Sequence, residues 1–352
     1  MAQAFVPACL PAPRAGAPPV KPPAPGAGPP IAVLGQRGAH VGPLALALAG
    51  FPGLTTIGES DRAIVQRQGA EAGLDRLALA YLRGDRSAGA PPGEYQSAVL
   101  EQVRSVEHAR PRIIKVELTG PVSLALLGVD EHERPLAYDP ALREALGQHV
   151  ALRARWLHEQ ITMAGAAPLL CLDEPFLEAL YSPFCPLAWD EGADLLARTL
   201  AEIPGWRGLC VAGGARWADL LELPIDLILF DAAAHSADLV QAAQATGQFL
   251  DRGGALGWGV VPAEAPEPIE QWRDIMTRRF IGAVEQLAAA SNVPAGAIAS
   301  RSLISTSSAL GHLPAGQATR AAALCAEIAA AVQAHFGIGQ EAPRPVAAPA
   351  RP

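Results

Sequence analysis

The sequence has few charged and few aromatic residues for its length. Of its 352 residues, 18% are charged and 5% are aromatic, and the formal net charge is −8 at pH 7. Nowhere do lysine and arginine cluster with interleaved aromatic residues, although nucleic-acid-binding proteins need such a basic surface to neutralise phosphates. The sequence therefore predicts a protein that does not bind nucleic acid.

The chain has only five cysteines, none in a Cys-x-x-Cys pair: Cys9, Cys171, Cys185, Cys210 and Cys325. Such a scattered, odd set argues against a disulfide framework and a compact zinc knuckle, and it favours a reducing, cytoplasmic location. Long apolar runs are missing too, because none reaches the roughly 18 residues that a membrane-spanning helix needs. We therefore expect no membrane partner.

Two nucleotide-binding signatures are also absent. No Gly-x-Gly-x-x-Gly opens a helix, and the segment GQRGAHVG at residues 35–42 lacks the Lys-Ser/Thr that completes a phosphate-binding loop. The sequence thus predicts no nucleotide cofactor.

What the chain has in quantity is alanine, proline and glycine at its two ends. Ten of its 33 prolines lie in residues 1–30, and residues 339–352 have the same character. Segments of this kind bury too little apolar surface to offset the entropy that they lose on ordering. We expect disordered extensions there, on either side of a single domain at residues 31–338.

Within that domain, short apolar runs alternate with longer helical patterns. Residues 140–163 and 270–290 carry the clearest helical spacing. Seven apolar runs, flanked by Gly, Pro or Asp, suit buried parallel strands. They are Leu54–Gly58, Ile113–Thr119, Leu169–Asp173, Gly208–Ala212, Leu227–Asp231, Leu256–Val261 and Ile298–Ser305.

One continuous series of strand–helix units predicts an α/β fold, a (β/α)8 barrel of the TIM type. The competing fold, an open doubly wound sheet, would carry a glycine fingerprint after its first strand, and none is present. The eighth strand of the barrel lies either at Ile31–Leu34 or within residues 82–102.

The carboxyl ends of the predicted strands carry acidic residues. In a barrel, catalytic groups gather at these ends, where Asp173, Glu174 and Asp231 follow apolar runs. A carboxylate there can bind an ammonium group, act as a base or ligate a metal. The alternative is that it caps the next helix. Cys210, within an apolar run, is either a metal thiolate or a small core residue.

Six phrases of the chain follow one another in a characteristic order. They are LTTIGES at residues 54–60, KVELTGPVSLALL at 115–127, LLCLDEPFL at 169–177, RWADLLELPIDLILFDA at 216–232, GGALGWGVVP at 253–262 and RSLISTSSALG at 301–311. Together they resemble the carboxy-terminal barrel of cobalamin-independent methionine synthase and its single-barrel relatives. That family shares a superfamily with uroporphyrinogen decarboxylase. The resemblance covers residues 52–335 and implies a methyltransferase of methionine biosynthesis.

The resemblance also implies a zinc site. In the family, zinc binds the acceptor thiol, usually homocysteine, and lowers its pKa so that the thiolate attacks the donor's methyl group. The four ligand positions fall on Cys210, Ala212, Asp231 and Ser308. Ala212 has no donor atom, and a serine hydroxyl is a weak ligand beside thiolate or imidazole. These replacements argue against a closed zinc cage and leave Cys210 and Asp231 as the candidate ligands.

A rebuilt zinc site stays open as an alternative. His235 and His312 lie four residues beyond the acidic position and the last ligand position, and imidazole is a good zinc ligand.

On the substrate side, the resemblance implies that Asp173, with Glu174 beside it, holds the amino group of an amino-acid substrate. It implies that the backbone of Ile57 and Gly58 receives the substrate carboxylate, where Glu59 would add repulsion. Family members with two barrels use the amino-terminal barrel to help bind folate. No second barrel is expected here, so the resemblance implies a corrinoid protein or another small methyl donor in place of folate.

Three functions remain open from the sequence. The first is methyl transfer to or from a small thiol such as homocysteine. The second is a non-catalytic binding or regulatory barrel that keeps the pocket but has lost the metal. The third is metal-independent chemistry of the decarboxylase kind, in which Asp173, Glu174 and His312 act as acid–base groups.

Overall fold

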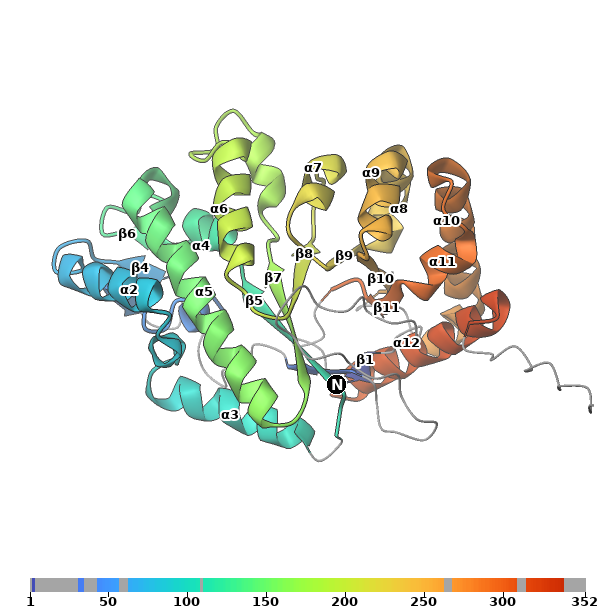
Figure 1. The fold of residues 1–352 in the computed structure, drawn as a ribbon, viewed down its shortest axis with the longest axis horizontal. Coiled ribbons are helices and arrows are strands. Elements are labelled where there is room, and N and C mark those ends of the chain that lie inside the picture. The colour runs from blue at the N-terminus through green and yellow to red at the C-terminus, as the bar shows by residue number, and fades with distance from the viewer. Residues whose placement is uncertain are drawn as a thin grey trace, which may run out of the picture.

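Seven parallel strands form one curled sheet, and a two-residue antiparallel strand extends its edge (Figure 1). The computed structural model describes residues 2–3, 31–34, 43–56, 63–107, 110–262, 268–308 and 315–338. In spatial order the strands are β1 (Ala2–Gln3), β2 (Ile31–Leu34), β5 (Ile113–Thr119), β7 (Ala167–Asp173), β8 (Trp206–Val211), β9 (Leu227–Asp231), β10 (Ala255–Val261) and β11 (Ser302–Thr306). From β5 onwards, this spatial order is also the order along the chain.

Helices connect successive strands and cover the outer side of the curled sheet (Figure 1). They are α4 (Pro121–Leu127), α5 (Pro140–Met163), α6 (Trp189–Ala201), α7 (Trp217–Glu222), α8 (Ala232–Gln241), α9 (Ala243–Asp251), α10 (Arg273–Ser291), α11 (Ala295–Ser300) and α12 (Ala315–Phe336). Short 3-10 turns interrupt the connections at Leu136–Tyr138, Leu177–Tyr181 and Ile269–Trp272. This alternation is an α/β fold in which all carboxyl ends of the parallel strands meet at one edge.

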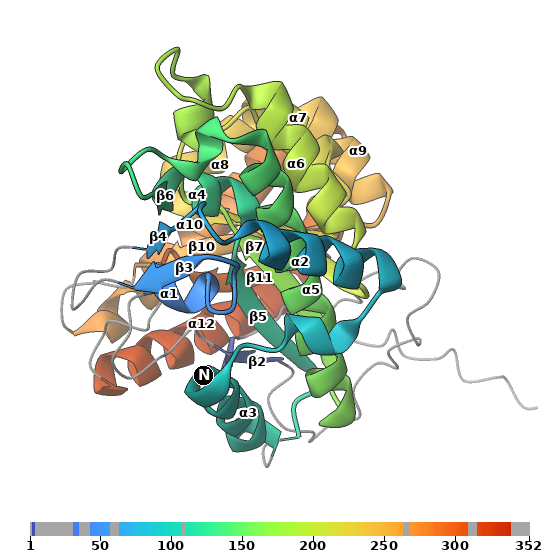
Figure 2. The same ribbon diagram turned by 90° about the vertical axis from the view of Figure 1, so that its left-hand side faces the viewer.

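The segment between β2 and β5 is built differently. It holds α1 (Pro43–Ala47), α2 (Glu71–Arg83), a 3-10 turn at Arg86–Gly89 and α3 (Gly93–Glu107), which lie beside α5 (Figure 2). It also contributes β3 (Leu54–Thr56) and β4 (Ala63–Val65) to a small second sheet, which β6 (Val129–Asp130) completes.

Six of the seven strands predicted from the sequence overlap strands of the main sheet, some of them with shifted bounds. Ile113–Thr119, Leu227–Asp231 and the helix at 140–163 are confirmed to the residue. Of the two segments considered for a further strand, Ile31–Leu34 forms β2, which is one of the seven parallel strands, whereas residues 82–102 are largely helical.

Two predicted strands were wrong in part. The run from Leu54 forms β3, which pairs with β4 in the small sheet and not with the main one. Three residues are too few to cross a barrel wall, and the antiparallel partner β4 follows directly along the chain. The run from Ile298 begins with α11, and the strand starts only at Ser302. Apolar residues of that helix are fully buried, and burial alone does not distinguish helix from strand.

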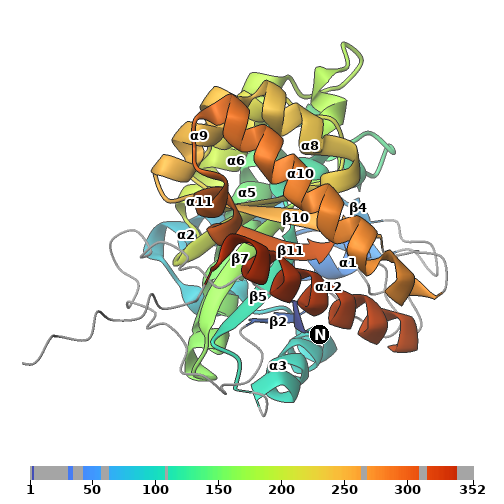
Figure 3. The same cartoon turned by 90° about the vertical axis from the view of Figure 1, so that its right-hand side faces the viewer.

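The curled sheet has two free edges within the described ranges, at β1 and at β11. Helix α12 contacts both β11 and β1, and Figure 3 shows it running beside the strands at this side of the molecule. A fully closed eight-stranded barrel stays a prediction. Of the expected disordered extensions, residues 339–352 and residues 1–30 apart from β1 lie outside the described residues.

A continuous row of aromatic rings anchors the helices to the outer face of the sheet. Phe230 of β9 lies between Trp217 of α7 and Trp258 of β10, with ring centroids 5.3 and 5.1 Å apart. The ring of Trp258 in turn meets Phe280 of α10 at 5.3 Å, and its indole N–H donates to Ser302 Oγ at 3.0 Å. Because Trp258 is only 1% exposed, its side chain contributes most of its transfer free energy to folding.

Local sequence signals explain where the long helix α5 begins. Asp139 is its N-cap and accepts from Ala141 N–H at 2.9 Å and from Leu142 N–H at 3.3 Å. Pro140 takes the first helical position, where its missing N–H is not needed. None of the helices in the described part of the chain has the length and hydropathy needed to cross a bilayer.

Replacing Trp258 by alanine removes the centre of the aromatic row. We expect Trp258→Ala to lower the free energy of unfolding by about 3–5 kcal/mol, since it leaves a cavity and removes the hydrogen bond from the indole to Ser302 Oγ. Urea denaturation followed by circular dichroism measures the change. Phe184→Ala is the control, because Phe184 is 90% exposed and should shift stability by less than about 0.5 kcal/mol. Equal losses in both variants would contradict this account of the core.

Candidate functional site

Side chains on the inner face of the sheet change from apolar to polar toward the carboxyl ends of the strands. A small cluster made mainly of strand residues, which includes Leu169, Trp206, Leu227 and Leu303, forms the apolar layer. Because side chains alternate along a strand, residues two or four positions further face the same way. These residues form the inner polar set: Lys115, Glu117, Cys171, Asp173, Cys210, Asp231 and Ser305.

A buried ion pair lies at the centre of the inner polar set. Lys115 Nζ is 2.6 Å from Glu117 Oε1, and the lysine side chain is only 1% exposed. Burial alone would lower the pKa of Lys115, but the nearby Glu117 carboxylate outweighs it and raises that pKa. The lysine in turn holds the pKa of Glu117 below its usual value. Both shifts favour the charged forms, so the two groups form an ion pair at neutral pH.

Cys210 belongs to the same cluster. Its Sγ lies 3.8 Å from Glu117 Oε1, and it shares a hydrogen bond with Cys171 of the neighbouring strand. The hydrogen bond with Cys171, burial and the charge of Glu117 together raise the pKa of Cys210 well above its usual value. The side chain is thus a neutral thiol that donates toward a carboxylate.

Asp173 ends β7 on the open side of the ion pair. Strand pairing sets it between Thr119 and Cys210. Burial, and then the charge of Glu117, raise its pKa from 3.8 to about 6, while Lys115 opposes the shift. A cationic ligand would lower the pKa of Asp173 again, because an ammonium group beside the carboxylate stabilises its charged form.

Glu174, next along the chain, has a different position. It is fully buried, and its oxygens accept from Val122 N–H at 3.0 Å and Ser123 N–H at 2.7 Å, at the start of α4. Gly120 leaves the room for it, since a Cβ there would lie 2.1 Å from Glu174 Oε1. The geometry is that of an acid holding a helix N-terminus, which the sequence had left open as an alternative to substrate binding.

The four family zinc positions do not fit a zinc ion. Ala212 is exposed and has no donor, and Ser308 is exposed, with its backbone carbonyl accepting from Thr306 Oγ1 at 2.8 Å. Asp231 caps α8 by accepting from Ala233 N–H at 2.8 Å. Cys210 points to Glu117 and stays protonated. Across the described residues, no three side chains of His, Cys, Asp or Glu gather closely enough to hold a metal ion.

Of the two histidines proposed for a rebuilt site, His235 is the one that the structure describes, and it contacts its own helix and Trp217. His235 lies on α8 with its Nδ1 2.9 Å from Asp238 Oδ2 and its ring 5.8 Å from that of Trp217. His312 lies outside the described residues. So do Ile57, Gly58 and Glu59, the positions expected to receive a substrate carboxylate.

Sequence reasoning missed Lys115 and Glu117 as parts of the site. Both lie in the run IIKVELT, where two charged residues alternate with apolar ones inside a strand of a strongly apolar sheet. That alternation was a usable signal, because buried charges are rarely tolerated in a strand unless they pair with each other.

The loops that follow β7 and β8 are hydrogen-bonded to each other beyond the carboxyl ends of these strands. Glu178 accepts from Gly214 N–H at 3.2 Å, and the Tyr181 hydroxyl accepts from Arg216 N–H at 2.7 Å. The ring of Tyr181 stacks on Trp189 at 5.2 Å. These contacts fix the carboxyl ends of β7 and β8, which carry Asp173 and Cys210, relative to each other.

Comparison with known proteins gives low similarity. No family model matches the chain, and no curated protein matches it. A solved B12-independent methionine synthase from Shewanella sp. W3-18-1, in complex with selenomethionine, is 14% identical with a TM-score of 0.46, covering 66% of this chain and 67% of its own. A methyltransferase from Methanosarcina mazei is 13% identical with a TM-score of 0.47 (70% and 67%). A putative vitamin-B12-independent methionine synthase from Listeria monocytogenes is 16% identical with a TM-score of 0.46 (66% and 69%).

The raised pKa of Asp173 predicts a specific pH dependence of stability. Because the folded pKa of about 6 exceeds the ordinary 3.8, the folded state holds the extra proton between these values, and stability falls as pH rises through them. Asp173→Asn should match the wild type below pH 4 and be more stable by roughly 3 kcal/mol above pH 6. Urea unfolding from pH 3.5 to 7.5 measures this. If the unfolding free energies of wild type and Asp173→Asn differed by the same amount at every pH, the raised pKa of Asp173 would be contradicted.

Proposed function

We propose that this protein is a methyltransferase of the methionine-synthase kind that binds a small amino-acid thiol at the carboxyl ends of its parallel strands, without a zinc cage. The observation that carries the proposal is the mostly buried carboxylate of Asp173 beside the Lys115–Glu117 pair, on the inner face of β7 and β5. The assignment of methyl transfer rests on the ordered sequence motifs, which include the strands that carry these residues.

The role of Asp173 follows from its electrostatics. It is mostly buried, so its charge is costly when the site is empty. The ammonium group of an amino acid compensates that charge, and this pairing would orient the thiol toward the remaining inner polar set. Lys115 and Glu117 neutralise each other, so they shape the floor of the site without competing for the ammonium group.

The methyl-transfer step needs only the substrates. The sulfur of the thiol attacks the methyl carbon, the S–C bond forms, and the donor leaves with the electron pair of its bond to that carbon. The thiol proton passes to water. A methylated corrinoid carried by a partner protein is the donor that this proposal includes, since its methyl group is transferred readily to thiolates.

Without zinc, the pH dependence of the reaction is steep. A free thiol with a pKa near 8.5 is only a few per cent ionised at neutral pH. We therefore expect the rate of homocysteine methylation from methylcobalamin to rise about tenfold per pH unit up to roughly pH 8.5. Initial rates from pH 6 to 9, after dialysis against a chelator, measure it. A rate that is flat across neutral pH and disappears on dialysis would point to an activating metal.

Binding is tested separately from turnover. We expect Asp173→Asn to weaken homocysteine and methionine binding at least about tenfold in calorimetry, because the ammonium partner is lost. Asp75→Asn is the matched control, since Asp75 is an exposed carboxylate on α2, far from the inner face. Unchanged affinity in Asp173→Asn would overturn the proposed substrate site.

A second function, a non-catalytic binding barrel, is favoured by one observation. The sulfur of Cys210 is a neutral thiol held by Glu117, so the family's thiol-activating chemistry has no replacement among the described residues. Amino-acid binding that depends on Asp173, combined with no methyl transfer at any pH, would select this function over the first.

A further inference from the structure

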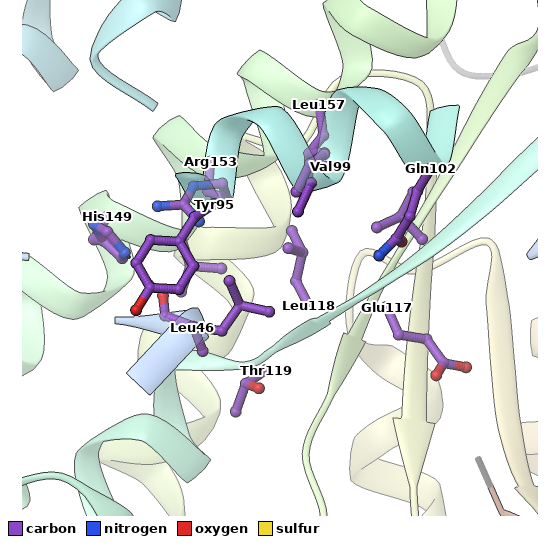
Figure 4. Close-up of a pocket in the computed structure, with 14 residues that line it drawn as sticks. Leu46, Tyr95, Val99, Gln102, Glu117, Leu118, Thr119, His149, Arg153 and Leu157 are labelled. Atoms are coloured by element: carbon purple, nitrogen blue, oxygen red, sulfur yellow. Dashed lines mark hydrogen bonds between the residues drawn. The ribbon is translucent and has the colours of Figure 1, made fainter. Parts of the chain in front are cut away.

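A partly open cavity lies on the opposite side of β5 from most of the inner polar set. It has a volume of about 60 Å³ and is lined by α1, α3, α5 and the outer face of β5 (Figure 4). Side chains of Val116 and Leu118 face it, while the carboxylate of Glu117 points away from it. The cavity is therefore separated from the proposed substrate site by the strand itself.

The volume suits a small organic molecule. A single water needs roughly 10–15 Å³ measured in this way, so the space holds several waters or one compact ligand of about six non-hydrogen atoms. The walls are mainly apolar, with Val99, Leu118 and Leu157 around the middle (Figure 4). Apolar walls give water few hydrogen-bond partners and favour an apolar occupant.

One end of the cavity carries a buried cation. Arg153 is 8% exposed, and its guanidinium donates from Nε to Gly89 O and from Nη2 to Ala49 O, both at 2.7 Å. An arginine has five N–H donors, so three remain. No carboxylate among the described residues forms an ion pair with Arg153. A buried charge paired only with carbonyl groups is unusual, because desolvation is then incompletely offset.

The groups beside Arg153 do not neutralise it. His149 Nε2 lies 3.1 Å from Ala47 O, and burial, followed by the charge of Arg153, lowers the pKa of His149 to about 3. The histidine is therefore neutral, whereas burial lowers the pKa of Arg153 only to about 10. The Tyr95 side chain lies at the same end (Figure 4) and offers a hydroxyl group.

We propose that this cavity is a binding site for a small branched aliphatic carboxylate, whose carboxylate pairs with Arg153 and whose alkyl group packs among Val99, Leu118 and Leu157. The carboxylate supplies the missing counter-charge in a planar, bidentate form that a guanidinium matches. The alkyl group fills space that water occupies poorly. Larger anions such as nucleotides exceed the volume.

Isobutyrate is the probe, and isobutyramide is its neutral counterpart of the same shape. In an NMR titration of ¹³C-methyl-labelled protein, we expect isobutyrate to shift the Val99, Leu118 and Leu157 methyl signals with a dissociation constant in the millimolar range or below. Isobutyramide should bind at least about tenfold more weakly, because it cannot pair with the cation. This comparison leaves Arg153 and its structural hydrogen bonds intact.

A cavity-filling variant gives the second test. Ala98→Leu adds an isopropyl group to the methyl at the cavity wall and should abolish the isobutyrate shifts, while Ser97→Leu, at an exposed position of the same helix, should leave them unchanged. Equal binding of acid and amide would overturn the charge pairing. Saturation by neither probe, or binding that survives Ala98→Leu, would overturn the site.

Discussion

The buried ion pair between Lys115 and Glu117 is the constraint on which the inner face depends. Two charges inside an apolar sheet are tolerated only as partners, and their 2.6 Å contact fixes both side chains on β5. The carboxylate then holds the thiol of Cys210 and raises the pKa of Asp173. The charge of Glu117 thus adds to burial in raising the pKa of Asp173, and it adds to burial and the Cys171 hydrogen bond in raising that of Cys210.

That pairing also bears on the zinc-ligand positions of the resembling family, because it engages Cys210, and the other positions in the described part of the chain do not complete a metal site. A zinc cage needs thiolates or neutral imidazoles that converge on one point. In this chain the cysteine at the first ligand position donates toward Glu117, the acidic residue at the third caps α8, and the other two positions offer no strong ligand. The inner face also carries Asp173, whose carboxylate charge is disfavoured by burial and by Glu117. An ammonium group beside it would stabilise that charge.

Strand β5 separates two sites of different character. Its inward residues carry the ion pair, and its outward residues Val116 and Leu118 line the cavity that Arg153 closes at one end. Because residues of a strand alternate between faces, seven consecutive residues can serve both sites without conflict. The long helix α5 supplies Arg153 and His149 from one face, four residues apart, so a single helix turn forms the polar end of the cavity.

The sequence by itself determined the succession of strands and helices, because apolar runs, flanking glycines and N-caps such as Asp139 act over a few residues. It also brought Asp173 and Asp231 to the carboxyl ends of parallel strands, since those ends must meet at one edge. Only the tertiary structure decided what each group contacts. Glu174 turns behind the sheet to the start of α4, β3 leaves the main sheet for a separate one, and Lys115 finds Glu117. The contact of Glu174 with α4 and that of Cys210 with Glu117 join residues far apart in the chain, and local patterns carry no information about which distant partner will be within reach.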